Sequence, residues 1–298
     1  MGFNWIGKSS DGKTVTLKQL DSSSFRFAPY FNSEWEKLNA DLIRMGAVLD
    51  VETTGFHQED DRIIEIGIRQ FKFNRETGEL LSLGESVSAF QDPGFPLSED
   101  IIALTGITDE MVENQKIDWN QVNSVLSQVQ VVIAHNAAFD RPFIDQLSTV
   151  SPEKIWGCSL KQIDWNAKGF FSPKLELLSI YHGFFTGAHR ALNDAEALLY
   201  LLSHTDSSTG KTYFHELLQN AKKTTIHMIA ANSPFESKDV LKERGYRWDG
   251  KNRYWSKHIT QDEQKSELEW LEAVVYLGPF RGKFVEIKPV DHFKASGN

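Results

Sequence analysis

Four carboxylates and one histidine lie in three short segments of the chain that are otherwise largely apolar. They are Asp50 and Glu52 in VLDVETTG, Asp140 in AHNAAFD, and His189 and Asp194 in HRALND. Alternate residues of a strand share one face, so Asp50 and Glu52 point the same way if the first segment is a strand. Two carboxylates that lie close together on one face repel each other unless a cation lies between them. Taken alone, the pattern is more typical of a solvated strand face than of a cation site, although the apolar flanks indicate a strand that is buried on at least one side.

Each segment also has an ordinary structural explanation, which the residues by themselves leave open. Carboxylates on a strand can face solvent, and Asp140, just before Pro142, can cap the first turn of a helix. His189 and Asp194 are five residues apart. On a continuous helix that separation is about 500° and would put them on different faces. We therefore expect His189 on a loop and Asp194 in the first turns of the helix that follows.

Strands come first around these motifs, and helices and strands alternate after them. The strand VLDVETTG is followed by two β-rich runs, RIIEIGIRQFKFN and ELLSLGESVSAF, which predict an antiparallel meander. Later periodicities predict a strand at VVIAHN and helices at SEDIIALTG, TDEMVENQ, WNQVNSVLSQV, FDRPFIDQL, LELLSIYHGF and LNDAEALLYLLSH. This order is typical of an α/β domain. Before the first strand, EWEKLNADLIRM has apolar residues at helical spacing, which predicts a helix there.

Composition divides the chain into four parts. We expect an N-terminal extension over 1–40, the α/β domain over 41–204, a linker with a short helix over 205–222, and a small α+β domain over 223–298. The last part contains a strand (TTIHMIAA), a helix (SPFESKDVLKERG), a hairpin turning at Asp249-Gly250, and a final helix (TQDEQKSELEWLEAVVY). Ser233 and Glu236 have the spacing of a capping box at the start of the first of these helices.

Taken together, VLDVETTG, AHNAAFD and HRALND resemble the three exonuclease motifs of the DEDDh, or DnaQ-like, family of 3′–5′ exonucleases. The likeness extends over residues 44–204 and includes PLSEDIIALTGITDEMV between the first two motifs. The related DEDDy branch has Tyr at the position of Arg190, whereas His189 selects the DEDDh branch. The resemblance implies an RNase H-like fold, with a mixed five-stranded sheet and helices on both sides. It also implies a metal-dependent 3′–5′ exonuclease.

The same resemblance implies two divalent metal ions, Mg²⁺ or Mn²⁺, held by the four carboxylates. Two such ions about 3.5–4 Å apart activate a water and stabilise charge on the attacking and leaving oxygens. Mg²⁺ prefers oxygen ligands, and carboxylates supply them. Asp50 is the expected bridge between the ions, and Glu52 should also help to hold the attacking water or the terminal 3′-hydroxyl. His189, with an ordinary pKa of about 6.5, can accept the proton of that water.

Further site residues follow from the family likeness. The residues expected to hold the terminal nucleotide are Thr53, Thr54, Gly55 and Phe56, and those expected to pack on the terminal base are Thr105, Gly106 and Ile107. The segment LTGIT that contains the last three is also an ordinary helix end with a glycine stop. His135 and Asn136 are expected to support the site by fixing the loop that aims Asp140.

Charge is unevenly distributed along the chain, whose formal net charge is −9. Residues 222–298 carry 14 Lys and Arg against 11 Asp and Glu, a net charge of +3, which leaves −12 for residues 1–221. The C-terminal hairpin combines aromatic and basic residues, of which Arg247, Trp248, Arg253 and Trp255 are candidates for binding a nucleic-acid strand. The alternative is a small domain whose aromatic residues form its core. The segment SPFESKDVLKERGYRWDGKNRYW resembles a module of stand-alone bacterial DnaQ-like exonucleases.

Single-stranded DNA is the expected partner, and the expected products are nucleoside 5′-monophosphates. Two alternatives remain open: an RNase T-like exoribonuclease or oligoribonuclease, and a catalytically silent nucleic-acid-binding module. GKSSDGKT (7–14) satisfies the phosphate-binding P-loop pattern, but only six residues precede it and VTLKQL after it reads as a strand. Cys158, the only cysteine, is expected to be a buried apolar residue. With no long apolar run, we expect no membrane partner and a cytoplasmic location.

Overall fold

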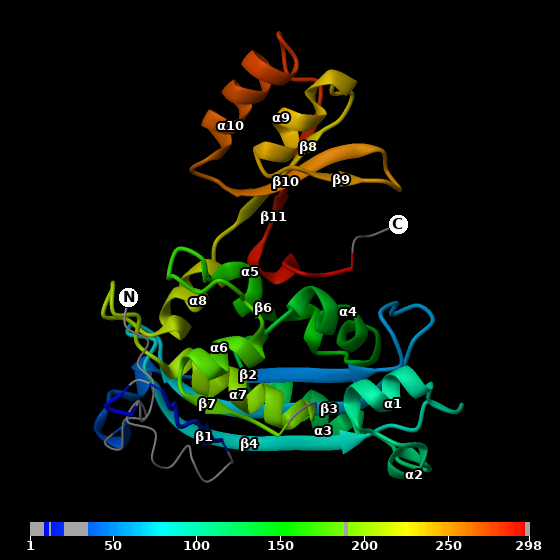
Figure 1. Cartoon of the computed structure of the whole chain (residues 1–298), viewed down its shortest axis with the longest axis vertical. Helices are drawn as coiled ribbons and strands as arrows, with labels where there is room; N and C mark the ends of the chain where they lie inside the picture. Colours follow the sequence, from blue (N-terminus) through cyan, green and yellow to red (C-terminus); the bar gives the residue numbers. More distant parts are fainter. Residues whose placement is uncertain (1–8, 12, 21–34, 188–189, 296–298) are drawn as a thin grey trace. The chain divides into compact units, whose positions relative to one another are not determined.

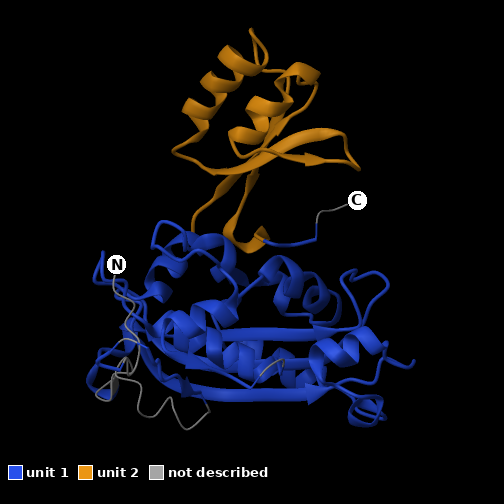
Figure 2. Ribbon diagram, in the orientation of Figure 1, with its two compact units in different colours: residues 1–221, 293–298 blue, residues 222–292 orange. Residues whose placement is uncertain are grey.

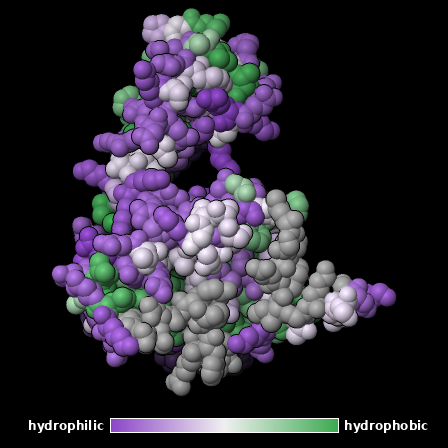
Figure 3. All heavy atoms as spheres, turned by 90° about the vertical axis from the view of Figure 1, so that its left-hand side faces the viewer, coloured by the Kyte–Doolittle hydropathy of each residue, from purple (hydrophilic) through white to green (hydrophobic). Residues whose placement is uncertain are grey.

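The computed structural model describes residues 9–11, 13–20, 35–187 and 190–295. These residues form two compact units (Figure 2). Unit 1 comprises residues 1–221 and 293–298, and unit 2 comprises residues 222–292. None of the helices described is both long enough and apolar enough to cross a membrane. Figure 3 shows a mainly hydrophilic face on which apolar side chains form scattered patches.

Unit 1 is built on a mixed five-stranded sheet with the order β4-β3-β2-β5-β6 (Figure 1). The strands are β2 (Ile43–Thr53), β3 (Ile63–Asn74), β4 (Leu80–Phe90), β5 (Val131–Ala134) and β6 (Ile155–Cys158). β2 pairs antiparallel with β3 and parallel with β5, which places the first acidic motif on the central strand. The predicted α/β class, the β3–β4 meander and the five-stranded mixed sheet are confirmed.

Helices cover both faces of this sheet, because apolar strand residues are buried on both of them. The helices of unit 1 are α1 (Glu99–Thr105), α2 (Asp109–Val112), α3 (Trp119–Ser127), α4 (Ala137–Leu147), α5 (Ser159–Gln162), α6 (Leu175–Tyr181), α7 (Ala191–Ser203) and α8 (Tyr213–Ala221). One core joins Ala47, Leu49 and Val51 of β2 to α3 and α4. The other joins Val48 to α6, α7 and α8. Alternation along β2 therefore turns its even-numbered residues toward α7.

The N-terminal part of unit 1 differs from the prediction. The residues expected to form one helix make two short 3-10 turns, Trp35–Lys37 and Ala40–Leu42, and β2 begins directly afterwards. The side chain of Asn39 accepts a hydrogen bond from the backbone N–H of Asp41, which favours a local turn over a continuous helix. The segment expected to be a simple extension also contributes β1 (Lys18–Gln19), which pairs parallel with β7 (Phe184–Phe185). Leu20, next to β1, is buried in the core under α7.

The segment expected to link two domains lies within unit 1. Thr205 and Thr212 form an isolated β-bridge, and Asp206 accepts a hydrogen bond from Lys168 at 2.6 Å. The helix that follows, α8, buries Phe214, Leu217 and neighbouring side chains against the sheet. Polar turn composition therefore suggested a linker where the chain makes a compact turn before the last helix of the core.

Unit 2 is a small α+β unit, as predicted. Its four-stranded antiparallel sheet has the order β11-β8-β10-β9. The elements are β8 (Thr225–Ala230), α9 (Lys238–Glu243), β9 (Arg247–Asp249), β10 (Tyr254–Thr260), α10 (Gln264–Trp270) continued by a π-helix (Leu271–Val275), and β11 (Lys283–Ile287). Both helices pack on the sheet face that carries Met228 and Ile259.

Three details of the C-terminal prediction are corrected. A 3-10 turn (Phe235–Ser237) precedes α9, so the helix starts too late for Ser233 and Glu236 to form the capping box. β11 was not predicted. Residues 293–298 belong to unit 1, where Phe293 packs against the core beneath α4.

We predict that Gly67→Ala destabilises unit 1. Gly67 lies on β3 under the start of α7, and an added Cβ would lie 2.1 Å from the backbone nitrogen of Leu192. Backbone cannot move as cheaply as a side chain, so the free energy of unfolding should fall by at least about 1–3 kcal/mol. Gly157→Ala is the matched control, since its Cβ would meet only side chains at 3.5 Å. Urea unfolding of both variants measures the difference, and equal stabilities would contradict the prediction.

Candidate metal centre

Three of the predicted acidic residues meet at the end of the central strand. Asp50 and Glu52 share the face of β2 that α7 covers, and Asp194 comes from the first turn of α7. Each offers a carboxylate oxygen, and these oxygens all lie within 4.8 Å of one another. All three side chains are partly buried. The pairing of β2 and the packing of α7 thus bring together residues that are more than 140 positions apart in the sequence.

Asp140 joins this cluster from the other side of the strand. β5 pairs with β2 only as far as Val48, so the backbone N–H of Val51 has no strand partner on that side. Oδ1 of Asp140, on α4, accepts a hydrogen bond from this N–H at 3.3 Å. The Asp140 side chain is only 2% exposed. Its carboxylate therefore lies beside the strand carrying Asp50 and Glu52, fixed by the point where strand pairing stops.

The electrostatics of the cluster favour neutralisation. Burial, followed by the charges of Asp140, Asp194 and Glu52, raises the pKa of Asp50 well above its ordinary value. Burial and the neighbouring carboxylates raise the pKa of Glu52 to about 7, and burial raises that of Asp140 to about 7. The carboxylates of this cluster ionise less readily than usual when no cation is present. Divalent metal ions such as Mg²⁺ prefer oxygen ligands, so the cluster fits such ions.

Glu65 fixes the start of α7. This role was not predicted from the sequence. This buried side chain accepts a hydrogen bond from Arg190 Nε at 2.9 Å and from the backbone N–H of Ala191 at 3.1 Å. The Arg190 guanidinium also lies over the ring of Phe90. His189 lies outside the described residues, but its neighbour is thus anchored to β3. A glutamate inside the apolar run IIEIGI was a signal of the same kind as the one that identified Asp50 and Glu52.

The strand register contributes to this arrangement. Glu65 pairs with Glu52, whereas the next pair along is Ile63 with Thr53, so Ile64 is an extra residue in β3. Such a bulge breaks the regular ladder at one point. It falls directly between the last acidic residue of β2 and the loop that follows.

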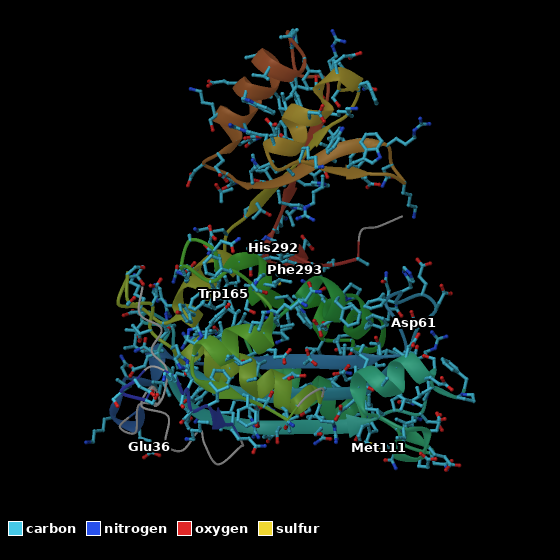
Figure 4. All side chains as sticks on the ribbon, viewed as in Figure 1. Glu36, Asp61, Met111, Trp165, His292 and Phe293 are labelled. Atoms are coloured by element: carbon cyan, nitrogen blue, oxygen red, sulfur yellow. The ribbon has the colours of Figure 1, made fainter. Side chains whose placement is uncertain are left out.

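The loop after β2 is closed by Asp61 (Figure 4). Its carboxylate accepts hydrogen bonds from Thr54 Oγ1 at 3.0 Å and from the backbone N–H of His57 at 2.9 Å. Thr53 Oγ1 donates to the carbonyl of Gly55 at 2.6 Å. A Cβ on Gly55 would lie 2.5 Å from the Asp61 carboxylate, so the loop requires glycine there. Asp61 was not predicted, because its role depends on the folded loop.

This loop presents an exposed aromatic ring beside the acidic cluster. Phe56 is 77% exposed, and its ring meets that of Phe139 edge to face at 6.2 Å. Phe139 in turn contacts Phe143 on the same helix that carries Asp140. Gln146 Nε2 donates to the carbonyl of Gln58 at 3.1 Å and so ties the loop to α4. An apolar surface therefore borders the carboxylates.

His135 supports the loop before α4 from inside the protein. Its Nε2 donates to the carbonyl of Pro173 at 2.8 Å, which leaves Nδ1 to accept from Ser159 Oγ at 2.7 Å. Burial lowers the pKa of His135 to about 4, so the ring is neutral. Asn136 begins α4 through its backbone, and its side chain makes no capping hydrogen bond. Cys158 is fully buried, as predicted.

The second group of predicted substrate residues forms a helix end. Gly106 ends α1 in the left-handed conformation with φ of 68°, and Thr105 Oγ1 donates to the carbonyl of Ile101. Ile107 is fully buried in a separate apolar cluster with Ile64. Ile107 is thus held in the interior of the fold, and its role of packing on the terminal base stays a prediction. Arg247, Trp248, Arg253 and Trp255 lie in unit 2.

An α/β unit with clustered carboxylates on its central strand has the architecture of a metal-dependent phosphodiester hydrolase. The family model described as Exonuclease (RNase_T) matches residues 47–202, more than half of the chain. The chain belongs to this DnaQ-like exonuclease family and is a nuclease. The family assignment and the RNase H-like fold predicted from the motifs are therefore confirmed.

The relatives include much longer proteins. The chain is 34% identical over 167 residues to a "DNA polymerase III PolC-type" protein of Listeria innocua, a match covering 52% of this chain and 11% of that protein. The chain thus spans about a tenth of the length of such relatives. Among solved structures, "Exonuclease X in complex with 5' overhanging duplex DNA" aligns with a TM-score of 0.43 at 22% identity, covering 59% of this chain and 98% of that one. E. coli Exonuclease I with a 5cy-dT13 oligonucleotide aligns with a TM-score of 0.47 at 14% identity, covering 73% and 63%.

We predict that the metal-free protein loses stability through the acidic cluster as pH rises. The raised carboxyl pKa values mean that the folded state binds more protons than the unfolded state between pH about 4 and about 7. Asp50→Asn should therefore melt higher than wild type at pH 8 in chelator, and the difference should shrink toward pH 5. Adding Mn²⁺ at pH 8 should stabilise wild type more than the variant.

The variant is needed as a reference because buried histidines act in the opposite direction. Burial lowers the pKa of His135 and His204 to about 4, so their contribution to stability is lost as pH falls. Both proteins keep these histidines, and the difference in melting temperature isolates the carboxylates. Differential scanning fluorimetry gives the values. A difference that does not change with pH or Mn²⁺ would contradict the prediction.

We predict that Glu65→Gln lowers kcat about 10- to 100-fold with little change in KM, because it releases Arg190 and the start of α7. Glu196→Gln is a matched control, since Glu196 is a buried glutamate that links α7 to Arg69 of β3 by an ion pair. Breaking either pair should lower stability, by up to about 3–5 kcal/mol. Steady-state kinetics and thermal unfolding of both variants separate the effects. Equal kcat values in the two variants would reduce Glu65 to a purely structural role.

Proposed function

We propose that this protein is a metal-dependent 3′–5′ exonuclease that shortens single-stranded DNA and releases nucleoside 5′-monophosphates. The observation that carries the proposal is the meeting of Asp50, Glu52 and Asp194 within 4.8 Å at the end of β2. The presence of all the acidic motif residues argues against a catalytically silent binding module. The likeness to polymerase-type proteins named for DNA supports DNA as the substrate.

In this proposal, Asp50, Glu52, Asp140 and Asp194 hold two divalent ions, Mg²⁺ or Mn²⁺. Such a pair of ions supplies a nucleophilic water near neutral pH and stabilises negative charge on both the attacking and the leaving oxygens. Asp50 would share in holding both ions, since the charges of Asp140, Asp194 and Glu52 all act on it. Glu52 additionally orients the attacking water or the terminal 3′-hydroxyl.

His189 is the proposed general base. It immediately precedes Arg190, which Glu65 holds at the start of α7. An imidazole with a pKa near 6.5 can accept a proton from water at neutral pH. Its proton leaves to solvent after each hydrolysis.

The loop closed by Asp61 is the proposed site for the terminal nucleotide. Thr53, Thr54 and Gly55 offer backbone groups beside the carboxylates, and the exposed ring of Phe56 offers a stacking surface for a base. Phe139 extends this surface toward α4. His135 and Asn136 support the site indirectly through the start of α4, and Thr105 and Gly106 shape the helix end nearby.

The proposal predicts stepwise shortening from the 3′ end. Single-stranded DNA labelled at its 5′ end should give a ladder in Mg²⁺ or Mn²⁺, whereas a 3′ label should be released at once as a mononucleotide. Asp50→Asn should lower the rate at least about 100-fold, because it removes a metal ligand. The control Asp100→Asn changes an exposed acidic residue on α1 and should behave as wild type.

The same time course with RNA of identical sequence decides between the two backbones. A higher rate on DNA supports the proposal, and a higher rate on RNA favours the exoribonuclease alternative. Intact labels at both ends in every metal would overturn the proposed function.

A further inference from the structure

The hairpin of unit 2 presents two tryptophans on one face. Trp248 on β9 pairs directly with Trp255 on β10, and their ring centroids are 5.7 Å apart. Trp255 packs against the core of unit 2, whereas Trp248 is 51% exposed. Trp156 and Trp165 of unit 1, by contrast, are fully buried. The Trp248 ring contacts Trp255 on one side and solvent on the other, so it offers a surface on which a base can stack.

Four basic residues in or beside the hairpin fall into two groups. Arg244 and Lys257 are engaged internally, since both form ion pairs with the buried Glu267. Arg247 and Arg253 are exposed and form no ion pair with any residue in the described part of the chain. The ion pairs with Glu267 therefore explain Arg244 and Lys257 as residues that stabilise unit 2. They do not explain the side chains of Arg247 and Arg253.

The turn of the hairpin is rigid and keeps its acidic residue occupied. Asp249 accepts hydrogen bonds from the backbone N–H and the Nδ2 of Asn252, at 2.8 and 2.9 Å. Arg253 follows in the left-handed conformation with φ of 56°, and its N–H donates to the carbonyl of Asp249. No other acidic residue lies between 247 and 260. The turn thus holds an arginine in a defined place beside the Trp248–Trp255 pair.

The hairpin also lies at a free edge of the sheet. β9 is the outermost strand, next to β10 and with no partner on its other side among the described residues. Arg247 leaves β9 on the face opposite Trp248 but along this same edge. A long arginine side chain at an edge and an aromatic ring beside it are the combination that lets a protein follow a sugar-phosphate backbone while stacking on its bases.

We propose that this hairpin, residues 247–257, binds single-stranded nucleic acid, with Trp248 stacking on a base and Arg247 and Arg253 contacting phosphates. In this respect the inference rests on the proposed function, since the bound strand would be the one whose 3′ end is degraded. Charge supports the assignment: the net charge of residues 222–298 is +3 and that of residues 1–221 is −12. A polyanion is therefore attracted to the C-terminal part and repelled by the rest, apart from the metal centre.

Binding of a 5′-fluorescein-labelled 20-mer of oligo(dT) to the full chain, followed by fluorescence anisotropy in EDTA, tests the proposal. Chelation prevents hydrolysis, so binding is read independently of catalysis. Trp248→Ala should raise Kd about tenfold, as expected for the loss of one stacked base. Trp248→Phe should restore most of the affinity. The double variant Arg247→Glu with Arg253→Glu should weaken binding and reduce the slope of log Kd against log salt by about 1.4.

Matched changes elsewhere in unit 2 serve as controls. Phe235→Ala removes an exposed aromatic ring, 75% exposed, and Lys265→Glu reverses an exposed charge on α10; both lie outside the hairpin. Melting temperatures identify any variant that fails to fold, and the arginine variant keeps the tryptophan pair intact. Wild-type affinity in the Trp248→Ala and double-arginine variants, or equal losses in the controls, would overturn the proposal.

The outcome is separable from that of the proposed function. A protein that binds the oligonucleotide through this hairpin but shortens no substrate with metal present would keep the binding surface and lose the exonuclease assignment on single strands. If the wild-type protein shortens the substrate while the Trp248→Ala variant binds as tightly as wild type, the exonuclease assignment stands and the proposed binding surface is wrong.

Discussion

The repulsion among carboxylates at the end of β2 is the constraint around which unit 1 is organised. Asp50 is surrounded by the charges of Glu52, Asp140, Asp194 and Glu65, and burial adds to the cost of ionising it. Arg190 is the cation that favours the charged form of Glu52. A fold that tolerates this arrangement needs rigid backbone to hold the side chains, and it gains a place where cations bind strongly. The central strand supplies that rigidity because neighbours pair with it on both sides.

The contacts that position the carboxylates all involve backbone groups beside them. Asp140 is held by the N–H of Val51 where strand pairing stops. Asp194 is positioned by the contact of α7 with Gly67, where a side chain would not fit. Glu65 holds the first residues of the same helix. Supporting contacts of this kind orient metal ligands, and a functional site needs its groups held within about 0.5 Å of the productive geometry.

The fold class, the mixed sheet and the acidic set could be predicted from sequence because local patterns report them. Alternation located β2, and the types of Asp50, Glu52, Asp140 and Asp194 indicated their chemistry. Glu65 and Asp61 were missed because their importance depends on what long-range pairing and loop closure place beside them. β6 was missed because four residues carry too little periodicity. The turn before α8 was misjudged because polar residues are typical of linkers and of compact turns alike.

The bulge at Ile64 separates two parts of the site that differ in their freedom to change. Before it, the strand register fixes Asp50 and Glu52 on one face, and a slip by one residue would turn them into the apolar core under α3 and α4. After it, residues 54–62 form a loop closed mainly by its own hydrogen bonds. Insertions or substitutions in that loop can reshape the surface around Phe56 while the carboxylates stay in register. Selection can therefore alter what this surface contacts while the set of metal-binding oxygens stays the same.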